Sequence, residues 1–190
     1  MRRELSPQSP EEYLRNTVEA FNTCVNFLRN PNSFPNQQIN KLVTLLWQLI
    51  ENKEIHLVLD IRRRFRELSF YYERSGYLTT SSLFLPLDFL KQAYENPIYQ
   101  FGSIVFNASK VRDYYTGKIT EKNEPEIERR ARGYEAEALL TLQKMAKERG
   151  GTIEWTPYQL NVLRENPQGI ASLPRHLVYP TPVWQPPRHG

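Results

Sequence analysis

Apolar side chains recur at alternating intervals of four and three residues along most of this chain, and this spacing constrains the fold more than any other feature. In the first such segment they are Leu14, Val18, Phe21, Val25 and Leu28. A helix of about 3.6 residues per turn places these positions on one face. The sequence SPEE at residues 9–12 supplies an N-cap serine and a proline suited to the first turn. We therefore expect an amphipathic helix from Pro10 to the prolines that follow Arg29.

The same spacing predicts further helices over residues 37–50, 55–75, 86–94, 103–117, 125–149 and 157–165. Prolines, glycines and short polar stretches separate them. The segments 37–50 and 55–75 can also form one helix bent at Asn52, and residues 77–100 can form a long loop instead of a helix. Only short stretches such as GTIEW (151–155) have strand character. The sequence therefore predicts an all-α fold, a bundle of six or seven helices over residues 1–165.

The C-terminal residues 166–190 have no helical period, and we expect them to form an extended arm. They contain six of the 14 prolines of the chain. Proline fixes φ and favours an extended path, so such an arm loses little entropy when it docks. Its candidate anchors are Tyr179, Val183 and Trp184, because tyrosine and tryptophan commonly anchor interfaces. We expect these anchors in a groove of the same chain or on a neighbouring subunit.

Five arginines lie within residues 60–74, DIRRRFRELSFYYER. On the helix expected there, one outer face carries the candidate interface residues Leu59, Arg62, Arg63, Arg66 and Phe70. Arginine around an aromatic anchor is typical of a protein interface, and it also suits nucleic acid, where arginine contacts phosphate and a ring stacks on a base. Alternatively, the leucine and the phenylalanine pack on another helix of the same chain. Glu67 and Glu73 weaken the positive field and so disfavour nucleic acid.

A second basic group lies in the longest expected helix. Its arginines and the acidic residues around them are Arg129, Arg130, Arg132, Glu126, Glu128, Glu135 and Glu137. Acidic and basic side chains three or four residues apart pair on a helix surface. We therefore expect surface ion pairs there rather than a binding site.

The sequence contains no recognisable catalytic, metal-binding or phosphate-binding motif. Its histidines, His56, His176 and His189, lack the spacing that lets one helix face hold a metal. The single cysteine, Cys24, lies beside the apolar face of the first helix, where we expect a buried small hydrophobic side chain. A Cys24–His56 dyad across the bundle is the remaining catalytic arrangement. The eight glycines form no phosphate-binding loop, and we expect no cofactor, no metal and no enzymatic activity.

Charge and hydropathy favour a cytoplasmic protein or a part of a soluble macromolecular particle. The net charge is +4, and the longest apolar run, Leu42–Ile50, is about half of what spans a bilayer. The first residues contain no apolar core of a signal peptide. The expected partner is another protein or a second copy of the chain.

The expected function is that of a non-catalytic assembly protein, a connector- or adaptor-like subunit that docks through a helix face and the C-terminal arm. One alternative is a nucleic-acid-binding protein that uses the Arg62–Arg66 face. A second alternative is a small all-α enzyme whose site is assembled from residues far apart in the sequence.

Overall fold

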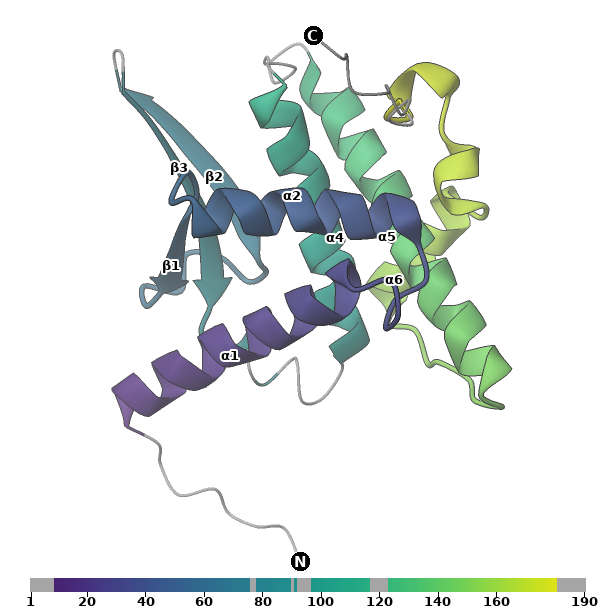
Figure 1. Ribbon diagram of the computed structural model, residues 1–190, viewed down its shortest axis with the longest axis horizontal. Coiled ribbons are helices and arrows are strands. Elements are labelled where there is room, and N and C mark those ends of the chain that lie inside the picture. The colour runs from purple at the N-terminus through teal and green to yellow at the C-terminus, as the bar shows by residue number, and fades with distance from the viewer. Residues whose placement is uncertain (1–8, 76–77, 90, 92–96, 117–122, 181–190) are drawn as a thin grey trace, which may run out of the picture.

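The computed structural model describes residues 9–75, 78–89, 91, 97–116 and 123–180. Its described elements are five α-helices, three strands and two short 3-10 helices (Figure 1). They are α1 (Pro10–Arg29), α2 (Gln37–Glu51), β1 (His56–Asp60), β2 (Ser69–Ser75), β3 (Leu78–Pro86), α4 (Pro97–Tyr115), α5 (Glu124–Glu148), α6 (Pro157–Glu165), η2 (Gly169–Ser172) and η3 (Arg175–Leu177). The prediction of an all-α bundle of six or seven helices is therefore wrong, because a small mixed sheet accompanies the helices.

Residues 55–75 form two strands and a connecting loop where the spacing predicts a helix. The apolar residues fit both periods, since Val58 and Ile61 are spaced as in a helix while Leu57 and Leu59 alternate as in a strand. Strand β3 decides between the two, because it pairs with both β1 and β2. Lys53 takes a left-handed conformation with φ of 60° and separates α2 from β1. A period counted within residues 55–75 contains no information about a strand that follows later in the chain.

The sheet has the strand order β1-β3-β2, with β1 parallel and β2 antiparallel to β3. The register places Leu83 of β3 beside both Leu57 and Phe70. These side chains form the inner face, which packs on the helices. Because side chains alternate along a strand, Val58, Tyr71 and Phe84 point to the opposite side, the outer sheet face. In Figure 1 the sheet stands at one side of the helices.

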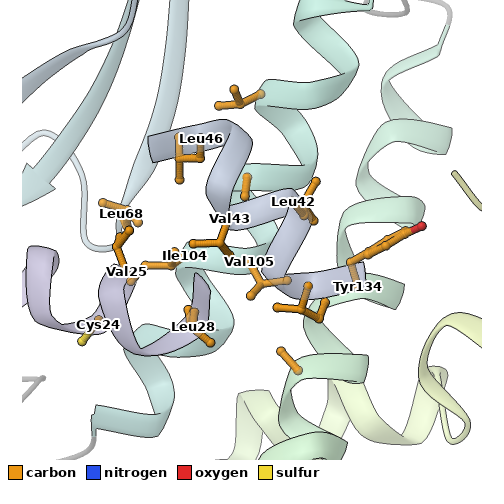
Figure 2. Packing of buried hydrophobic residues seen from close by; sticks show 14 of the residues in the cluster. Cys24, Val25, Leu28, Leu42, Val43, Leu46, Leu68, Ile104, Val105 and Tyr134 are labelled. Carbon is orange, nitrogen blue, oxygen red and sulfur yellow. The ribbon is translucent and has the colours of Figure 1, made fainter. Parts of the chain in front are cut away.

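Helix α4 contributes much of the hydrophobic core. Figure 2 shows side chains of several other elements around its buried residues Ile104 and Val105. They are Val25 and Leu28 of α1, Leu42, Val43 and Leu46 of α2, Tyr134 of α5, and Leu68, the residue that precedes β2 in the sequence. The predicted bounds of α1 are confirmed. Of its predicted apolar face, Phe21, Val25 and Leu28 are fully buried, whereas Leu14 is 37% exposed. Helices α2, α5 and α6 also begin and end within one residue of the predicted positions.

The C-terminal residues 169–180 lie against α5 (Figure 1). Two glycines allow this close approach. A Cβ on Gly133 of α5 would lie 2.5 Å from Cδ1 of Leu173, so no other residue fits there unless the Leu173 side chain moves. Gly169 has φ of 60°, and the next residue, Ile170, donates its backbone N–H to Oε2 of Glu137 over 3.0 Å. This part of the predicted arm therefore packs on its own chain.

Asn107 of α4 occupies one end of the β2 edge. Its Oδ1 accepts a hydrogen bond from the backbone N–H of Phe70 over 2.9 Å. Its Nδ2 donates to the carbonyls of Leu68 over 2.9 Å and Ser103 over 2.8 Å. The amide side chain thus ties the sheet to α4.

Candidate functional site

The arginines of the predicted interface lie on the loop between β1 and β2, which we call the arginine loop (Asp60–Arg66). Arg62, Arg63 and Arg66 are exposed there. Leu59 and Phe70 lie on the strands, half-buried, and pack against the core. The structure therefore brings the three arginines together and separates them from both apolar residues, because the helix that would have grouped them does not form.

The buried side chain of Asp60 fixes the conformation of the arginine loop. Its Oδ2 accepts a hydrogen bond from the backbone N–H of Phe65 over 2.7 Å, and its carbonyl accepts one from Arg63 over 3.1 Å. Arg63 has a left-handed φ of 51°. Burial raises the pKa of Asp60, but the backbone hydrogen bonds from Phe65 and Arg64 and the charge of Arg64 outweigh it and hold this pKa below its ordinary value. The loop is thus built around an internal carboxylate.

Aromatic side chains cover the outer sheet face next to the arginine loop. The Phe84 ring centroid lies 4.9 Å from that of Phe65 and 6.3 Å from that of Tyr71. The guanidinium carbon of Arg64 lies 4.7 Å from the Phe84 centroid, a cation–π contact. Ile61 of the arginine loop is 73% exposed, and Tyr71 of β2 is 51% exposed. An apolar and aromatic surface therefore adjoins the arginines.

The positive charge of Arg62, Arg63 and Arg66 is not paired with any acidic side chain in the part of the chain that the structure describes. The nearby Glu67 accepts a short hydrogen bond from the Tyr99 hydroxyl. The acid that follows the loop is therefore engaged with α4.

Tyr179, the first predicted anchor of the arm, is buried in its own chain. Its hydroxyl lies 2.9 Å from the carbonyl of Ser109 and 3.1 Å from Oδ1 of Asp113. Its ring lies 3.8 Å from the guanidinium carbon of Arg112 and 4.9 Å from the Tyr134 ring centroid. Burial, with the charge of Asp113, raises the pKa of Tyr179. The other two anchors, Val183 and Trp184, lie outside the described residues.

The residues that hold Tyr179 include a buried ion pair. Arg130 Nη1 lies 2.6 Å from Asp113 Oδ2, and Arg130 Nε donates to the carbonyl of Leu177 over 2.7 Å. Arg130 is 5% exposed, so the expectation of a surface ion pair at this residue is wrong. The sequence contains one signal of this burial. The small residues Ala131, Gly133, Ala136 and Ala138 lie on different faces of α5 and let neighbouring elements pack on more than one side of the helix.

A polar cleft of about 360 Å³ lies between β2, α4, α5 and α6. Glu135 of α5, the second wrongly expected surface charge, is 3% exposed and lines this cleft. The Tyr158 hydroxyl donates to its Oε2 over 3.1 Å, and Arg132 Nη1 donates to the Tyr158 oxygen over 3.0 Å. Burial raises the pKa of Glu135 to about 7, although Tyr158 and Arg132 lower it and Glu67 raises it further. The cleft therefore contains a carboxyl group that exchanges its proton near neutral pH.

The candidate cysteine–histidine dyad is not assembled. Cys24 is buried in the core, as expected, whereas His56 is exposed on β1. Burial raises the pKa of the Cys24 thiol to about 12, which keeps it from forming the nucleophilic thiolate at neutral pH. The described part of the chain contains no group of three histidine, cysteine or acidic side chains that could hold a metal ion. It also contains no helix with the length and apolar character needed to cross a bilayer.

Comparison with known proteins gives no relative: no protein-family model, no curated protein and no solved structure matches this chain.

Proposed function

We propose that this chain is a non-catalytic interaction protein, connector- or adaptor-like, that binds the acidic surface of a partner protein through the arginine loop and the outer sheet face. One observation carries the proposal: Ile61 is 73% exposed on a loop whose backbone is held by the buried Asp60. Arginine and aromatic side chains around an apolar centre are enriched in protein interfaces. Ile61 and Tyr71 supply the apolar part, and the exposed arginines of the loop supply the positive charge.

The fixed shape of the loop supports this proposal. Binding costs free energy when it orders a mobile segment, and a segment that is already ordered avoids part of that cost. The Asp60 carboxylate lies inside the loop and holds the backbone by a hydrogen bond from Phe65, whereas Arg62, Arg63 and Arg66 are exposed to solvent. A partner that presents carboxylates complements this surface and associates faster through electrostatic attraction.

The C-terminal residues 181–190 are the proposed second contact. Because Tyr179 is held between α4 and α5, the residues after Pro180 start from a fixed point of the domain. Val183 and Trp184 follow within five residues of Tyr179, so their attachment to the domain is short. Deleting residues 181–190 leaves the described contacts of Tyr179 in place, and we expect it to weaken partner binding.

The test is site-specific photo-crosslinking in cells that produce the full chain. A crosslinking amino acid replaces Ile61, and the matched control replaces the exposed Lys147 at the end of α5. A partner captured at position 61 and absent at 147 is then purified, and its affinity is measured by calorimetry. We expect Arg62→Glu, Arg63→Glu and Arg66→Glu together to weaken binding at least about tenfold, and equal affinity for this variant would contradict the proposal.

Nucleic acid is the second candidate partner, favoured by the half-exposed Tyr71 ring beside the arginines. A base can stack on such a ring while arginine contacts phosphate. Fluorescence anisotropy with single-stranded RNA and DNA separates the two candidates. Binding that falls steeply with salt and is lost in Tyr71→Ala selects nucleic acid, whereas no binding at low salt excludes it.

A further inference from the structure

The polar cleft beside Glu135 goes beyond the proposed interaction function, because none of its polar groups takes part in the arginine loop. Its lining has three parts: a buried carboxyl at one end, aromatic walls and a charged mouth. The residues that line it include Glu135, Tyr158, Tyr99, Phe106, Lys110 and Arg132. Each part recognises a different portion of a ligand.

The closed end offers a hydrogen-bond acceptor. Glu135 Oε2 accepts from Tyr158, but among the described residues no donor bonds to Glu135 Oε1. This oxygen lies 3.3 Å from the position that a Cβ on Gly102 would take, so the glycine of α4 leaves room next to it. A ligand N–H group that enters the cleft can donate to this oxygen and give the carboxylate a second hydrogen bond.

The walls are aromatic and suit a flat ring. Tyr99 and Tyr158 meet edge to face with ring centroids 6.2 Å apart. Phe106 and Phe70 come from α4 and β2. A planar heterocycle can stack on such side chains, as bases do on aromatic residues of nucleotide-binding sites, because every base has a π face.

The mouth combines two cations with one acid. Arg132 and Lys110 both lie over the Phe106 ring, each 5.6 Å from its centroid. Glu128, 41% exposed in its side chain, lies between them, with its oxygens 3.9 Å from Lys110 Nζ and 3.7 Å from Arg132 Nη2. At these distances the carboxylate forms weak ion pairs, and a phosphate would compete with it for both cations.

The two ends of the cleft are about two helical turns apart on α5. Glu128 and Glu135 are seven residues apart on α5, which is about 10 Å along the helix axis. The cleft volume of about 360 Å³ lies within the range of small-molecule sites.

We propose that this cleft is a binding site for a nucleoside monophosphate, with the base edge donating to Glu135 Oε1, the ring between the aromatic walls, and the phosphate at Lys110 and Arg132. Glu128 then acts as an internal competitor that gives up its two cations when the phosphate arrives. This arrangement accounts for the open acceptor, the aromatic walls and the paired cations together.

Binding should depend on pH. The charged and titratable groups that face Glu135 or the cleft around it are Glu67, Tyr99, Lys110, Glu128, Arg132 and Tyr158. Only the ionised Glu135 accepts an N–H donor at both oxygens, so affinity rises as pH passes through about 7, the pKa of this carboxyl. The nucleoside, which has no phosphate, separates the titration of Glu135 from that of the phosphate itself.

The experiment is calorimetry on the full chain with AMP, GMP, CMP and UMP, the four matching nucleosides and inorganic phosphate. We expect at least one nucleotide to bind at millimolar or lower concentration, and its nucleoside to bind more weakly. Glu135→Gln should weaken nucleotide and nucleoside equally, by about tenfold, because it removes a charge-assisted hydrogen bond. Arg132→Met should weaken the nucleotide more than the nucleoside, because it removes one of the two phosphate cations as well as the donor to Tyr158.

Glu128→Gln provides a variant with the opposite sign. It removes the internal competitor, so it should tighten the nucleotide several-fold and leave the nucleoside unchanged. The matched control is Glu148→Gln, an exposed acid at the end of the same helix, which should change neither. No binding by any of the four nucleotides, phosphate binding as tight as the nucleotide, or unchanged affinity in Glu135→Gln would each overturn the proposal.

Discussion

Arg130 Nη1 lies 2.6 Å from Asp113 Oδ2, and both side chains are nearly or fully buried between α4 and α5. The same arginine donates to the carbonyl of Leu177, and Oδ1 of the same aspartate lies 3.1 Å from the Tyr179 hydroxyl. One ion pair therefore joins two helices to the C-terminal segment. Its charges are held in place by partners on every side, which makes the loss of either one costly.

Removing one member of this pair should be more damaging than removing both. Asp113→Asn leaves the Arg130 charge buried without its counterion, and we expect it to lower the free energy of unfolding by about 3–5 kcal/mol. In the double variant with Arg130→Met no buried charge remains, so part of the loss should be recovered. Urea denaturation of the variants measures this. A double variant less stable than the single one would contradict the interpretation of this pair.

Tyr179→Ala should remove most of what fixes the C-terminal segment. The ring is buried against Tyr134 and Arg112, and replacing a buried aromatic side chain with alanine costs about 3–5 kcal/mol. Tyr179→Phe keeps the ring and removes only the hydroxyl, for which we expect about 1–3 kcal/mol, since Ser109 and Asp113 lose a partner. Equal stability of the alanine and phenylalanine variants would show that the ring contributes nothing.

The buried Glu135 should make the free energy of unfolding decrease as pH rises. Its pKa is raised from 4.5 to about 7 on folding, so the folded state binds its proton more tightly. Its stabilising contribution is complete below the unfolded pKa and is lost as pH rises through about 7, with a change of about 3 kcal/mol. Glu135→Gln carries no titrating group. The stability of this variant relative to the natural chain, measured by urea denaturation, should therefore increase between acidic and alkaline pH, while Glu148→Gln should track the natural chain throughout.

Asp60→Ala should release the arginine loop. The Phe65 N–H loses its acceptor, and we expect a loss of about 1–3 kcal/mol in the free energy of unfolding and faster hydrogen exchange at that amide. Because the pKa of Asp60 is lowered on folding, its contribution is present above its unfolded pKa and disappears as pH falls below about 4. Asp88→Ala, at an exposed position, is the control. Slow exchange at Phe65 in the Asp60 variant would contradict this function of the carboxylate.

The long helices could be predicted from the sequence because their stability depends on one apolar face and on local caps. Ser9 accepts from the Glu12 N–H, and Thr156 forms a capping box with Gln159, so α1 and α6 begin where the sequence indicates. The sheet could not be predicted, because β1 and β2 depend on β3, and the spacing within residues 55–75 is compatible with a helix. The wrong helix also grouped Leu59 and Phe70 with the arginines.

The polar sites were hidden for a different reason. Arg130 and Glu135 have the same charge pattern with their neighbours that a solvated helix has, and the difference lies in what covers α5. That cover comes from η2, α6 and α4, which are distant in the sequence or separated by a loop. A charge pattern indicates which side chains can pair along one helix, but it does not indicate which other elements bury that helix.

The Asn107 side chain has a consequence for solubility. An edge strand with free N–H and C=O groups can recruit a strand from another molecule and so begin aggregation. The Phe70 N–H and the Leu68 carbonyl already bond to the Asn107 amide, so an incoming strand cannot pair with these two groups of the β2 edge. The Asn107 amide therefore hinders edge-to-edge association at this position. A leucine of similar size would leave the two backbone groups without a hydrogen-bond partner and available to another chain.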